Sequence, residues 1–500
     1  MRILMVAAEL APLVKVGGLA DVAGALSREL GRRGHQVRVV LPLYGHLDRQ
    51  RLDIRPVAKL PPMAVRLGAG MHDIRWHLAG SGRGAVKIYL VEAELFARAG
   101  VYTDLLGRGF VDSLARAALH CQAALLLPRL LEWPVDVVHA HDAQAAPALV
   151  LRRELWAARP LPGPAAGVLT IHNLAHQEIH DPAQVALLGL PSTLAVYPGL
   201  LEFHGRLNLM KGGILAADRL NTVSPTYARE TTGSPEFGRG LEQVLGSRGA
   251  HYLGILNGGE YETWDPRRDP HLIARYGAGD LAGKARCREA LARELGLDAP
   301  AGRPVCGFVG RLVDQKGIDL LLPLLDRLAG DGFCFAVLGT GDPALEKAMA
   351  AAAGRNPRRV AFVGGFDEGL AHRIYAGSDL FLMPSLFEPC GLSQLYALRY
   401  GTPPVVRRTG GLADTVVDAP DEPGAGTDGG TGFVFAEPRS EALLGALRRA
   451  ERAFAAPAVW AGLQDRGMAC EFGWSRSAAA YEKMYAEAVA EAQGRLRHDP

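Results

Sequence analysis

The chain has 500 residues, of which 48% are hydrophobic and 22% charged, and its formal net charge is +2. This length predicts two or three domains of ordinary globular composition, and the near-neutral charge without a basic block argues against a general nucleic-acid binder. No apolar run approaches the length of a membrane-spanning helix, and six scattered cysteines without a CxxC pair argue against a disulfide or zinc framework and favour a reducing cytoplasm.

Short apolar runs alternate with helical patterns along the first half of the chain. Strands are predicted at residues 2–8, 37–41, 135–141, 167–172 and 220–223, with a helix at residues 21–34. The second half repeats this pattern, with strands at residues 305–309, 333–338, 360–363, 379–383 and 404–407 and a helix from about residue 318. Continuous apolar strands separated by helices are typical of a parallel sheet covered on both faces. We therefore predict an α/β protein with two doubly wound, Rossmann-like domains.

A segment rich in Gly, Asn and Pro, at residues 251–270, marks the crossing between the two halves. The predicted domains are residues 1–250 and 251–473. A terminal helix within residues 474–500, running to about residue 490 and frayed at its end, is predicted to pack back on the first domain. Open parallel sheets bind ligands at the carboxyl ends of their strands, so we expect the two domains to face a central cleft.

A glycine pair lies between the first predicted strand and the first helix, in the sequence Lys15-Val16-Gly17-Gly18-Leu19. Glycines allow the backbone to approach a ligand closely, and the amides at a helix start favour anions. Lys15 adds a positive charge. The segment is compatible with an anion-binding loop or with a plain strand-to-helix turn.

Charged residues follow two predicted strands of the second half. Arg311 and Lys316 precede a helix, where cations oppose the helix dipole, so a bound diphosphate would explain them; the alternative is a solvated surface loop. Glu388 also precedes a helix, where a carboxylate can bind sugar hydroxyls or simply favour the helix start. A second glycine pair, Gly410 and Gly411, follows the next strand.

Polar side chains end two predicted strands of the first half, namely His139, His141, Asp142, His172 and Asn173. The two-residue spacing of His139 and His141 places both on one face of a strand, which could hold a metal. Hydrogen bonding is the commoner role of such residues, so we favour sugar contact over metal binding.

Long, ordered blocks cover the chain almost from end to end and resemble bacterial glycogen synthases, the retaining GT-B glycosyltransferases that share a family with plant starch synthases. The blocks are AAELAPLVKVGGLADVAGAL, VVHAHD, TIHNLAHQ, NLMKGGILAADRLNTVSPTYARE, GILNGGEYETWDP, GRLVDQKG and FLMPSLFEPCGLSQLYALRYGTPPVVRRTGGLADTV. The resemblance implies transfer of glucose from ADP-glucose to the non-reducing end of an α-1,4-glucan such as glycogen, with retention of configuration. It implies no cofactor, and Arg311 and Lys316 could replace a metal at the departing diphosphate.

The resemblance also assigns roles to individual residues. Lys15, Arg311 and Lys316 would face the phosphates of the donor and, with His172 and Glu388, form the catalytic set. Further contacts to the donor would come from Gly18, Asp142, Asn257, Phe366, Cys390, Gly391, Leu392, Ser393, Thr409, Gly410 and Gly411. The acceptor side would be lined by Glu9, Asp21, Tyr102 and Ala143.

Two of these positions depart from the usual family pattern. Ala143 stands where a tryptophan is common, which removes a flat apolar face for a sugar ring and predicts weaker use of short oligosaccharides. Phe366 stands where a tyrosine usually stacks on adenine, and it keeps an aromatic face.

Three other functions are compatible with parts of the pattern. A related GT-B enzyme would use UDP-glucose or a small acceptor, and a non-catalytic homologue would only bind glucan. An NAD-dependent Rossmann enzyme is disfavoured because the first strand is not followed by G-x-G-x-x-G. The sequence leaves the oligomeric state open.

Overall fold

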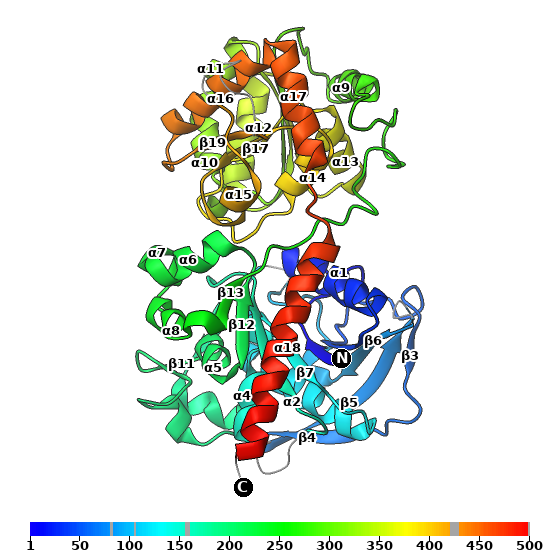
Figure 1. Cartoon of the computed structure of the whole chain (residues 1–500), viewed down its shortest axis with the longest axis vertical. Helices are drawn as coiled ribbons and strands as arrows, with labels where there is room; N and C mark the ends of the chain where they lie inside the picture. The colour runs from blue at the N-terminus through cyan, green and yellow to red at the C-terminus, as the bar shows by residue number, and fades with distance from the viewer. Residues whose placement is uncertain (81–83, 105–106, 156–160, 421–429, 499–500) are drawn as a thin grey trace. The chain divides into compact units, whose positions relative to one another are not determined.

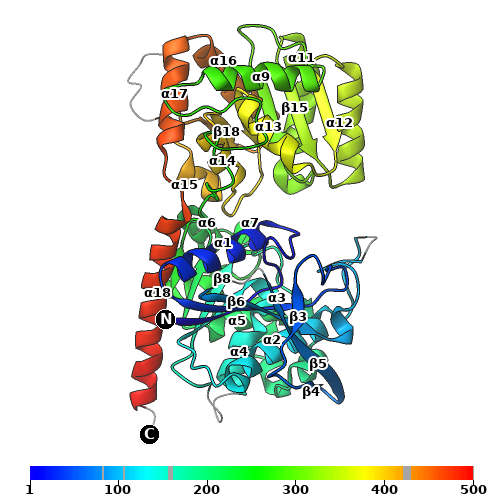
Figure 2. The same ribbon diagram turned by 90° about the vertical axis from the view of Figure 1, so that its right-hand side faces the viewer.

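The computed structural model describes residues 1–80, 84–104, 107–155, 161–420 and 430–498 (Figures 1 and 2). The chain divides into two compact units. Unit 1 comprises Met1–Val223, Ala228–Gly258 and Trp474–Pro500, and unit 2 comprises Ser224–Tyr227 and Gly259–Gly473. In the described part of the chain, no helix is both long and apolar enough to cross a membrane.

Unit 1 is built on a ten-stranded sheet in the order β13-β12-β8-β7-β1-β2-β6-β5-β3, with β4 paired to β5. Its strands are β1 (Arg2–Val6), β2 (Gln36–Pro42), β3 (Ile54–Pro56), β4 (Met63–Leu67), β5 (Gly70–Ala79), β6 (Val86–Glu92), β7 (Val137–His141), β8 (Ala166–Ile171), β12 (Arg219–Thr222) and β13 (Tyr252–Gly254). From β13 to β6 all neighbours are parallel, whereas β3, β4 and β5 add antiparallel pairs at one edge. A separate small sheet contains β9 (Ile179–His180), β10 (Glu202–Phe203) and β11 (Arg206–Asn208).

Helices cover both faces of the large sheet of unit 1. They are α1 (Gly18–Arg32), α2 (Ser113–Leu130), α3 (Asp142–Ala145), α4 (Pro147–Glu154), α5 (Leu209–Ala216), α6 (Pro225–Gly233), whose first residues belong to unit 2, α7 (Pro235–Gly238), α8 (Glu242–Gly246) and α18 (Trp474–His498). Alternate strand residues such as Ile3 and Met5 pack in one core with Ala478 and Tyr481 of α18. Figure 1 shows α18, in red, running along the unit 1 sheet, where it contacts β7, β8 and β12.

A buried chain of hydrogen bonds ties α18 to three strands. The Thr170 hydroxyl donates to Asn221 Oδ1 (2.7 Å), so it accepts from His139 Nε2–H (2.7 Å). His139 Nδ1 is then the bare nitrogen, and it accepts from the Tyr485 hydroxyl (2.8 Å). Asn221 Nδ2 donates to the Tyr481 hydroxyl (3.1 Å). These bonds satisfy polar groups that burial would otherwise leave unpaired.

Unit 2 is built on a six-stranded parallel sheet in the order β16-β15-β14-β17-β18-β19. Its strands are β14 (Val305–Val309), β15 (Cys334–Gly339), β16 (Val360–Gly364), β17 (Leu380–Met383), β18 (Pro404–Arg407) and β19 (Phe433–Phe435). Its helices are α9 (Ala282–Glu294), α10 (Ile318–Leu321), α11 (Leu325–Gly330), α12 (Pro343–Arg355), α13 (Glu368–Gly377), α14 (Ser393–Arg399), α15 (Gly410–Thr415), α16 (Ser440–Phe454) and α17 (Pro457–Ala469).

The strands of unit 2 alternate between two cores, as the period-two geometry of a strand requires. Cys306 and Leu380 pack with α10, α11, α12 and α16, whereas Val305 and Phe381 pack with α9, α13 and α14. Figure 2 shows α9 and α13 on the side of this sheet that faces the viewer. The sheet is therefore buried on both faces, which explains its continuous apolar strands.

The predicted doubly wound fold is confirmed in both units. The antiparallel strands β3, β4 and β5 were not predicted. The helix expected from residue 318 is interrupted after Leu321, where Pro323 lies in a 3-10 turn. The terminal helix continues to His498, past residue 490, where its frayed end was expected.

Candidate functional site

The predicted functional residues follow the carboxyl ends of parallel strands in each unit. In unit 1, the segment after β1 leads to α1, and Asp142 and His172 directly follow the neighbouring strands β7 and β8. In unit 2, Arg311 and Lys316 follow β14, Glu388 follows β17, and the second glycine pair follows β18. Strand pairing places β1, β7 and β8 side by side, and likewise β14, β17 and β18.

Residues 15–17, together with Gly18 at the start of α1, form a segment that is here called the glycine loop. Lys15 is exposed, and its ammonium lies 2.8 Å from the Asp21 carboxylate in the first turn of α1. Glu9 is 2% exposed and accepts hydrogen bonds from the amides of Val16 (2.5 Å) and Gly17 (2.8 Å). Glu9 therefore braces the loop, and its side chain is buried among the groups that donate to it.

Asp142 connects the ends of β7 and β8. Its backbone has a φ of 59°, and its carboxylate accepts from the amides of His172 (2.7 Å) and Asn173 (3.4 Å). Such a conformation is uncommon for residues with a Cβ, although Asp adopts it more readily than most. Burial raises the pKa of Asp142 to about 7, against the opposing effect of these two amides. Asp142 thus titrates close to neutrality, at the place where a sugar contact was predicted.

His172 is paired with His141 through a 2.9 Å contact between Nε2 of His172 and Nδ1 of His141. Burial lowers the pKa of His172 to about 3 and that of His141 well below its ordinary value. Both rings are therefore neutral, and one donates to the other. His172 is suited to hydrogen bonding, and its low pKa does not suit a cationic role at neutral pH.

In unit 2, Lys316 and Glu388 form a close ion pair. Lys316 Nζ lies 2.5 Å from Glu388 Oε2, which also accepts from the Ser385 hydroxyl (3.0 Å). Glu388 is only 6% exposed. Within the described residues, Glu388 Oε1 accepts no hydrogen bond. Since an ammonium carries three donors, two Lys316 N–H groups also remain beyond the bond to Glu388. Arg311 is exposed and makes no ion pair with any described residue.

Glycines allow the segments around Glu388 to approach each other. Gly317 has a φ of 65°, and a Cβ there would lie 2.0 Å from the Pro384 carbonyl oxygen. At Gly410, with a φ of 44°, a Cβ would lie 1.9 Å from the Glu388 carbonyl oxygen. The Gly411 amide donates to that same oxygen (3.0 Å). The second glycine pair therefore positions the Glu388 segment.

The remaining predicted residues of unit 2 lie in segments that follow strands of the same sheet. Phe366 is 77% exposed in the loop between β16 and α13, so its ring is free to stack on a base. The other predicted positions are the buried Cys390 and Thr409, the half-buried Gly391 and Leu392, and Ser393 at the start of α14. In unit 1, Asn257 is 5% exposed and its Oδ1 has no partner among the described residues.

Ala143, which we expected on the acceptor side, is buried. Its side chain is 0% exposed within the short helix α3, so it presents no surface on which a sugar ring could stack. An acceptor subsite that lacks a tryptophan at this position stays a prediction.

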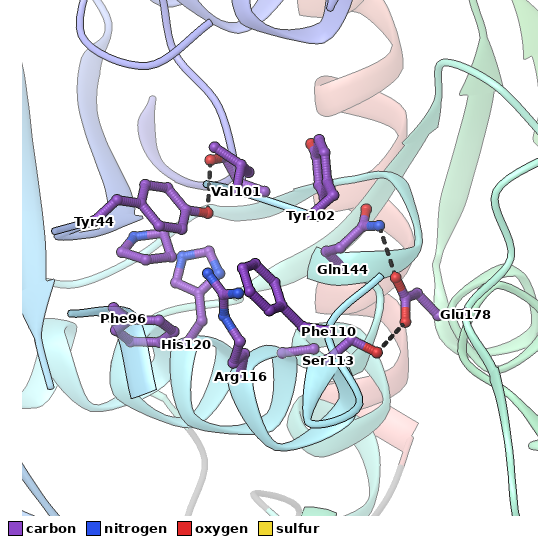
Figure 3. A pocket seen from close by; sticks show the side chains of 13 residues that line it. Tyr44, Phe96, Val101, Tyr102, Phe110, Ser113, Arg116, His120, Gln144 and Glu178 are labelled. Atoms are coloured by element: carbon purple, nitrogen blue, oxygen red, sulfur yellow. Dashed lines mark hydrogen bonds between the residues drawn. The ribbon is translucent and has the colours of Figure 1, made fainter. Parts of the chain in front are cut away.

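A cavity of about 40 Å³ lies in unit 1 beside Tyr102 (Figure 3). The guanidinium of Arg116, which is 6% exposed, lies over the ring of Phe110 at 4.3 Å. Glu178 accepts from Ser113 and Gln144, each at 3.0 Å. These residues were not predicted because they come from α2 and the loop before it, from α3 and from a loop before β9, with no shared motif.

The described residues contain no group of three or more His, Cys, Asp or Glu side chains placed to hold a metal ion. His139 and His141, which suggested a metal site, have ring centroids 4.1 Å apart. Both ring nitrogens of His139 take part in hydrogen bonds, to Thr170 and Tyr485.

Comparison with known proteins supplies relatives along the whole chain. The family model described as the starch synthase catalytic domain matches residues 2–247, and that of the glycosyl transferases group 1 matches residues 296–453. The chain is 46% identical to a glycogen synthase of Anaeromyxobacter sp. (strain Fw109-5) over 488 residues, which cover 97% of this chain and 99% of that protein. It is 45% identical to a glycogen synthase of Thioalkalivibrio sulfidiphilus (strain HL-EbGR7) over 498 residues, covering 98% and 100%.

A solved structure is similar over the same length. The catalytic domain of starch synthase IV from Arabidopsis thaliana, bound to ADP and acarbose, matches with a TM-score of 0.88 and 32% identity, covering 98% of this chain and 99% of that one.

Buried neutral histidines predict that unit 1 loses stability in mild acid. Burial lowers the pKa of His120 to about 4 and that of His139 to about 3, and it acts in the same direction on His141 and His172. Below pH 6.5 the unfolded chain protonates these four groups and the native state does not, so their stabilising effect is lost as the pH falls. Asp142 has the opposite effect and offsets one of these four protons. Its raised pKa keeps it protonated in the native state below about pH 7, where the unfolded chain has lost that proton.

For these five groups alone, the net difference of three protons predicts that the free energy of unfolding falls by roughly 4 kcal/mol per pH unit around pH 5. Urea unfolding at a series of pH values measures this slope. His120 donates Nε2–H to the Val40 carbonyl (3.0 Å), a bond that the amide of Gln can replace. His120→Gln should therefore reduce the slope by about 1.4 kcal/mol per pH unit. A wild-type stability that is flat between pH 6.5 and 5 would contradict the prediction.

The burial of Ala143 predicts that Ala143→Trp destabilises the protein, because an indole must be forced into a filled core. The expected cost is about 1–3 kcal/mol or more in the free energy of unfolding. Calorimetry on this variant and on Ala175→Trp, at an exposed position of the same unit, measures the difference. If the variant kept wild-type stability and lowered the KM for maltooligosaccharides, Ala143 would face an acceptor after all.

Proposed function

The chain belongs to the family of bacterial glycogen synthases and starch synthases, and on that premise we propose that it transfers glucose from ADP-glucose to the non-reducing end of an α-1,4-glucan, with retention of configuration. It is a glycosyltransferase with a GT-B fold. ADP as the nucleotide is supported by the starch synthase IV structure, which holds ADP. The glucan acceptor is supported by relatives named glycogen synthase along the full chain.

The observation that carries the proposed chemistry is the hydrogen-bonding capacity left at the Lys316–Glu388 pair. Lys316 keeps two N–H donors for anionic oxygens, and Glu388 keeps Oε1 as an acceptor for a sugar hydroxyl. Their mutual bond fixes one donor and one acceptor side by side before any ligand binds. This arrangement suits a ligand in which a hydroxylated sugar is joined to a phosphate.

Bond breaking in the donor transfers negative charge to the departing diphosphate. Lys316 and the exposed Arg311 are proposed to stabilise that charge, which is larger in the transition state than in the ground state. Preorganised cations act here without a bound metal. Unit 1 is proposed to contribute the glycine loop with Lys15 to the donor, and the neutral His172 and Asp142 to the sugar hydroxyls.

We also propose that the enzyme works in a reducing cytoplasm. All six cysteines are free thiols, and five of them are buried. Burial raises the pKa of Cys121 and Cys306. These thiols therefore stay protonated, are poor nucleophiles and resist oxidation.

Donor choice gives the first test of this function. Incubation with ADP-glucose and glycogen should release ADP, and kcat/KM should be higher for ADP-glucose than for UDP-glucose. Activity should persist in EDTA, because Arg311 and Lys316 supply the positive charge. Parallel reactions without glycogen measure donor hydrolysis. Preference for UDP-glucose would overturn the donor assignment, and activity lost in EDTA and restored by Mg²⁺ would overturn the metal-free mechanism.

Lys316→Met should lower kcat by about 10²–10³, since a lost transition-state charge contact commonly costs that much. Steady-state kinetics with ADP-glucose and glycogen measure the effect, and the melting temperature confirms that the variant is folded. Lys347→Met, which removes an exposed lysine from α12, is the matched control and should keep wild-type kcat. A folded Lys316→Met enzyme with near-normal kcat would show that the ion pair is structural only.

A further inference from the structure

We infer that Glu9 and Tyr102 are positioning residues that hold the glycine loop in its ligand-binding shape, and that they are not acceptor contacts. The inference rests on the proposed function for the identity of the donor. It rests on the hydrogen bonds and burial of unit 1 for everything else.

Glu9 uses both carboxylate oxygens inside the protein. Its Oε2 accepts from the amides of Val16 (2.5 Å) and Gly17 (2.8 Å), and its Oε1 accepts from the Tyr102 hydroxyl (2.6 Å). The residue is 2% exposed. A carboxylate with three donors in a buried position is fixed in place, and so is the backbone that donates to it.

These two amides directly precede the first residues of α1. Gly17 is the N-cap of this 15-residue helix, and no side chain caps it. Within the described residues, the amides of Gly18 and Leu19 donate to no acceptor. Glu9 thus satisfies the amides before the helix and leaves those at its start free. Free amides at a helix N-terminus, beside Lys15, are the feature that binds a phosphate.

Tyr102 holds Glu9 from the opposite side. Burial, followed by the charge of Glu9, raises the pKa of Tyr102 well above its ordinary value, so its hydroxyl remains a donor. Its ring lines the cavity seen in Figure 3, together with Phe110 and Arg116. Tyr102 therefore connects the packing of this cavity to the glycine loop through Glu9.

The loop is also held at its other end, because the Lys15 ammonium is paired with Asp21 (2.8 Å). Without Glu9, the Lys15–Asp21 pair would remain as a tether, but half of the Lys15 side chain is exposed and such pairs stabilise weakly. The backbone of Val16 and Gly17 would then lose its fixed direction. A displacement of about 1 Å in a positioned group can lower a rate by about 10².

A hydrogen-bonding role predicts that the conservative substitution rescues function. The Oε1 of Gln at position 9 can accept from both amides, and its NH₂ group can donate to the Tyr102 oxygen. Glu9→Ala should lower kcat/KM for ADP-glucose by roughly 10–100-fold. Glu9→Gln should stay within about threefold of wild type, and the KM for glycogen should be unchanged in both. Tyr102→Phe should lower kcat/KM for ADP-glucose by an amount between those of Glu9→Gln and Glu9→Ala.

Hydrogen exchange measures the loop without any activity. In wild type, the amides of Val16 and Gly17 should be protected by Glu9. Glu9→Ala and Tyr102→Phe should speed exchange in a peptide spanning residues 10–19, whereas Glu9→Gln should not. Tyr252→Phe is the matched control, because it removes a half-buried hydroxyl that forms a hydrogen bond with Thr231 (2.8 Å) elsewhere in unit 1. It should change neither exchange in this peptide nor donor kinetics.

Two results would overturn the inference. One is a raised KM for glycogen with donor kinetics unchanged in Glu9→Ala, which would make Glu9 an acceptor contact. The other is wild-type exchange of the loop in both Glu9→Ala and Tyr102→Phe. If Glu9→Ala does not fold, Tyr102→Phe alone decides. A wild-type enzyme that does not use ADP-glucose would refute the proposed donor, and the exchange result would then decide the positioning role.

Discussion

The parallel pairing of the strands is the constraint on which the rest of this structure depends. Parallel strands end at a common edge, so residues that directly follow them are brought together even when they are far apart in the sequence. In unit 2 this edge collects the segments after β14, β17 and β18, and the Lys316–Glu388 pair joins residues 72 positions apart. In unit 1 the same rule brings the segment after β1 beside Asp142 and His172.

Close approach of these segments sets the requirements on their sequence. Gly317 and Gly410 are needed where one backbone nearly touches another, at Pro384 and at Glu388. Buried carboxylates are tolerated because each meets several donors: Glu388 meets Lys316 and Ser385, and Glu9 meets two amides and a hydroxyl. The glycines of both loops thus act in two ways, since one pair leads to free helix amides and the other fixes the course of a neighbouring segment.

The sequence predicted most of the sheet strands that are buried on both faces, because continuous apolar runs identify them directly. It did not predict β3, β4 and β5 at the edge, which have a weaker alternating pattern. It placed Lys316 and Glu388 after two strands of one predicted sheet but could not pair them, because strand order and side-chain contacts were not predicted. For the same reason it could not show that Ala143 is buried, or that the Gly411 amide is taken by Glu388.

The assignment of α18 to unit 1 has a consequence for how the protein is made. Residues 259–473 lie between this helix and the rest of unit 1, so a ribosome must add about 240 residues after Gly258 before α18 is complete. At about 5–20 residues per second, this delay is roughly 10–50 s. During that time β7, β8 and β12 lack their cover, and His139 and Asn221 lack their tyrosine partners. The first unit to be translated is therefore the last to close, and the nascent chain exposes an apolar sheet face that chaperones can bind.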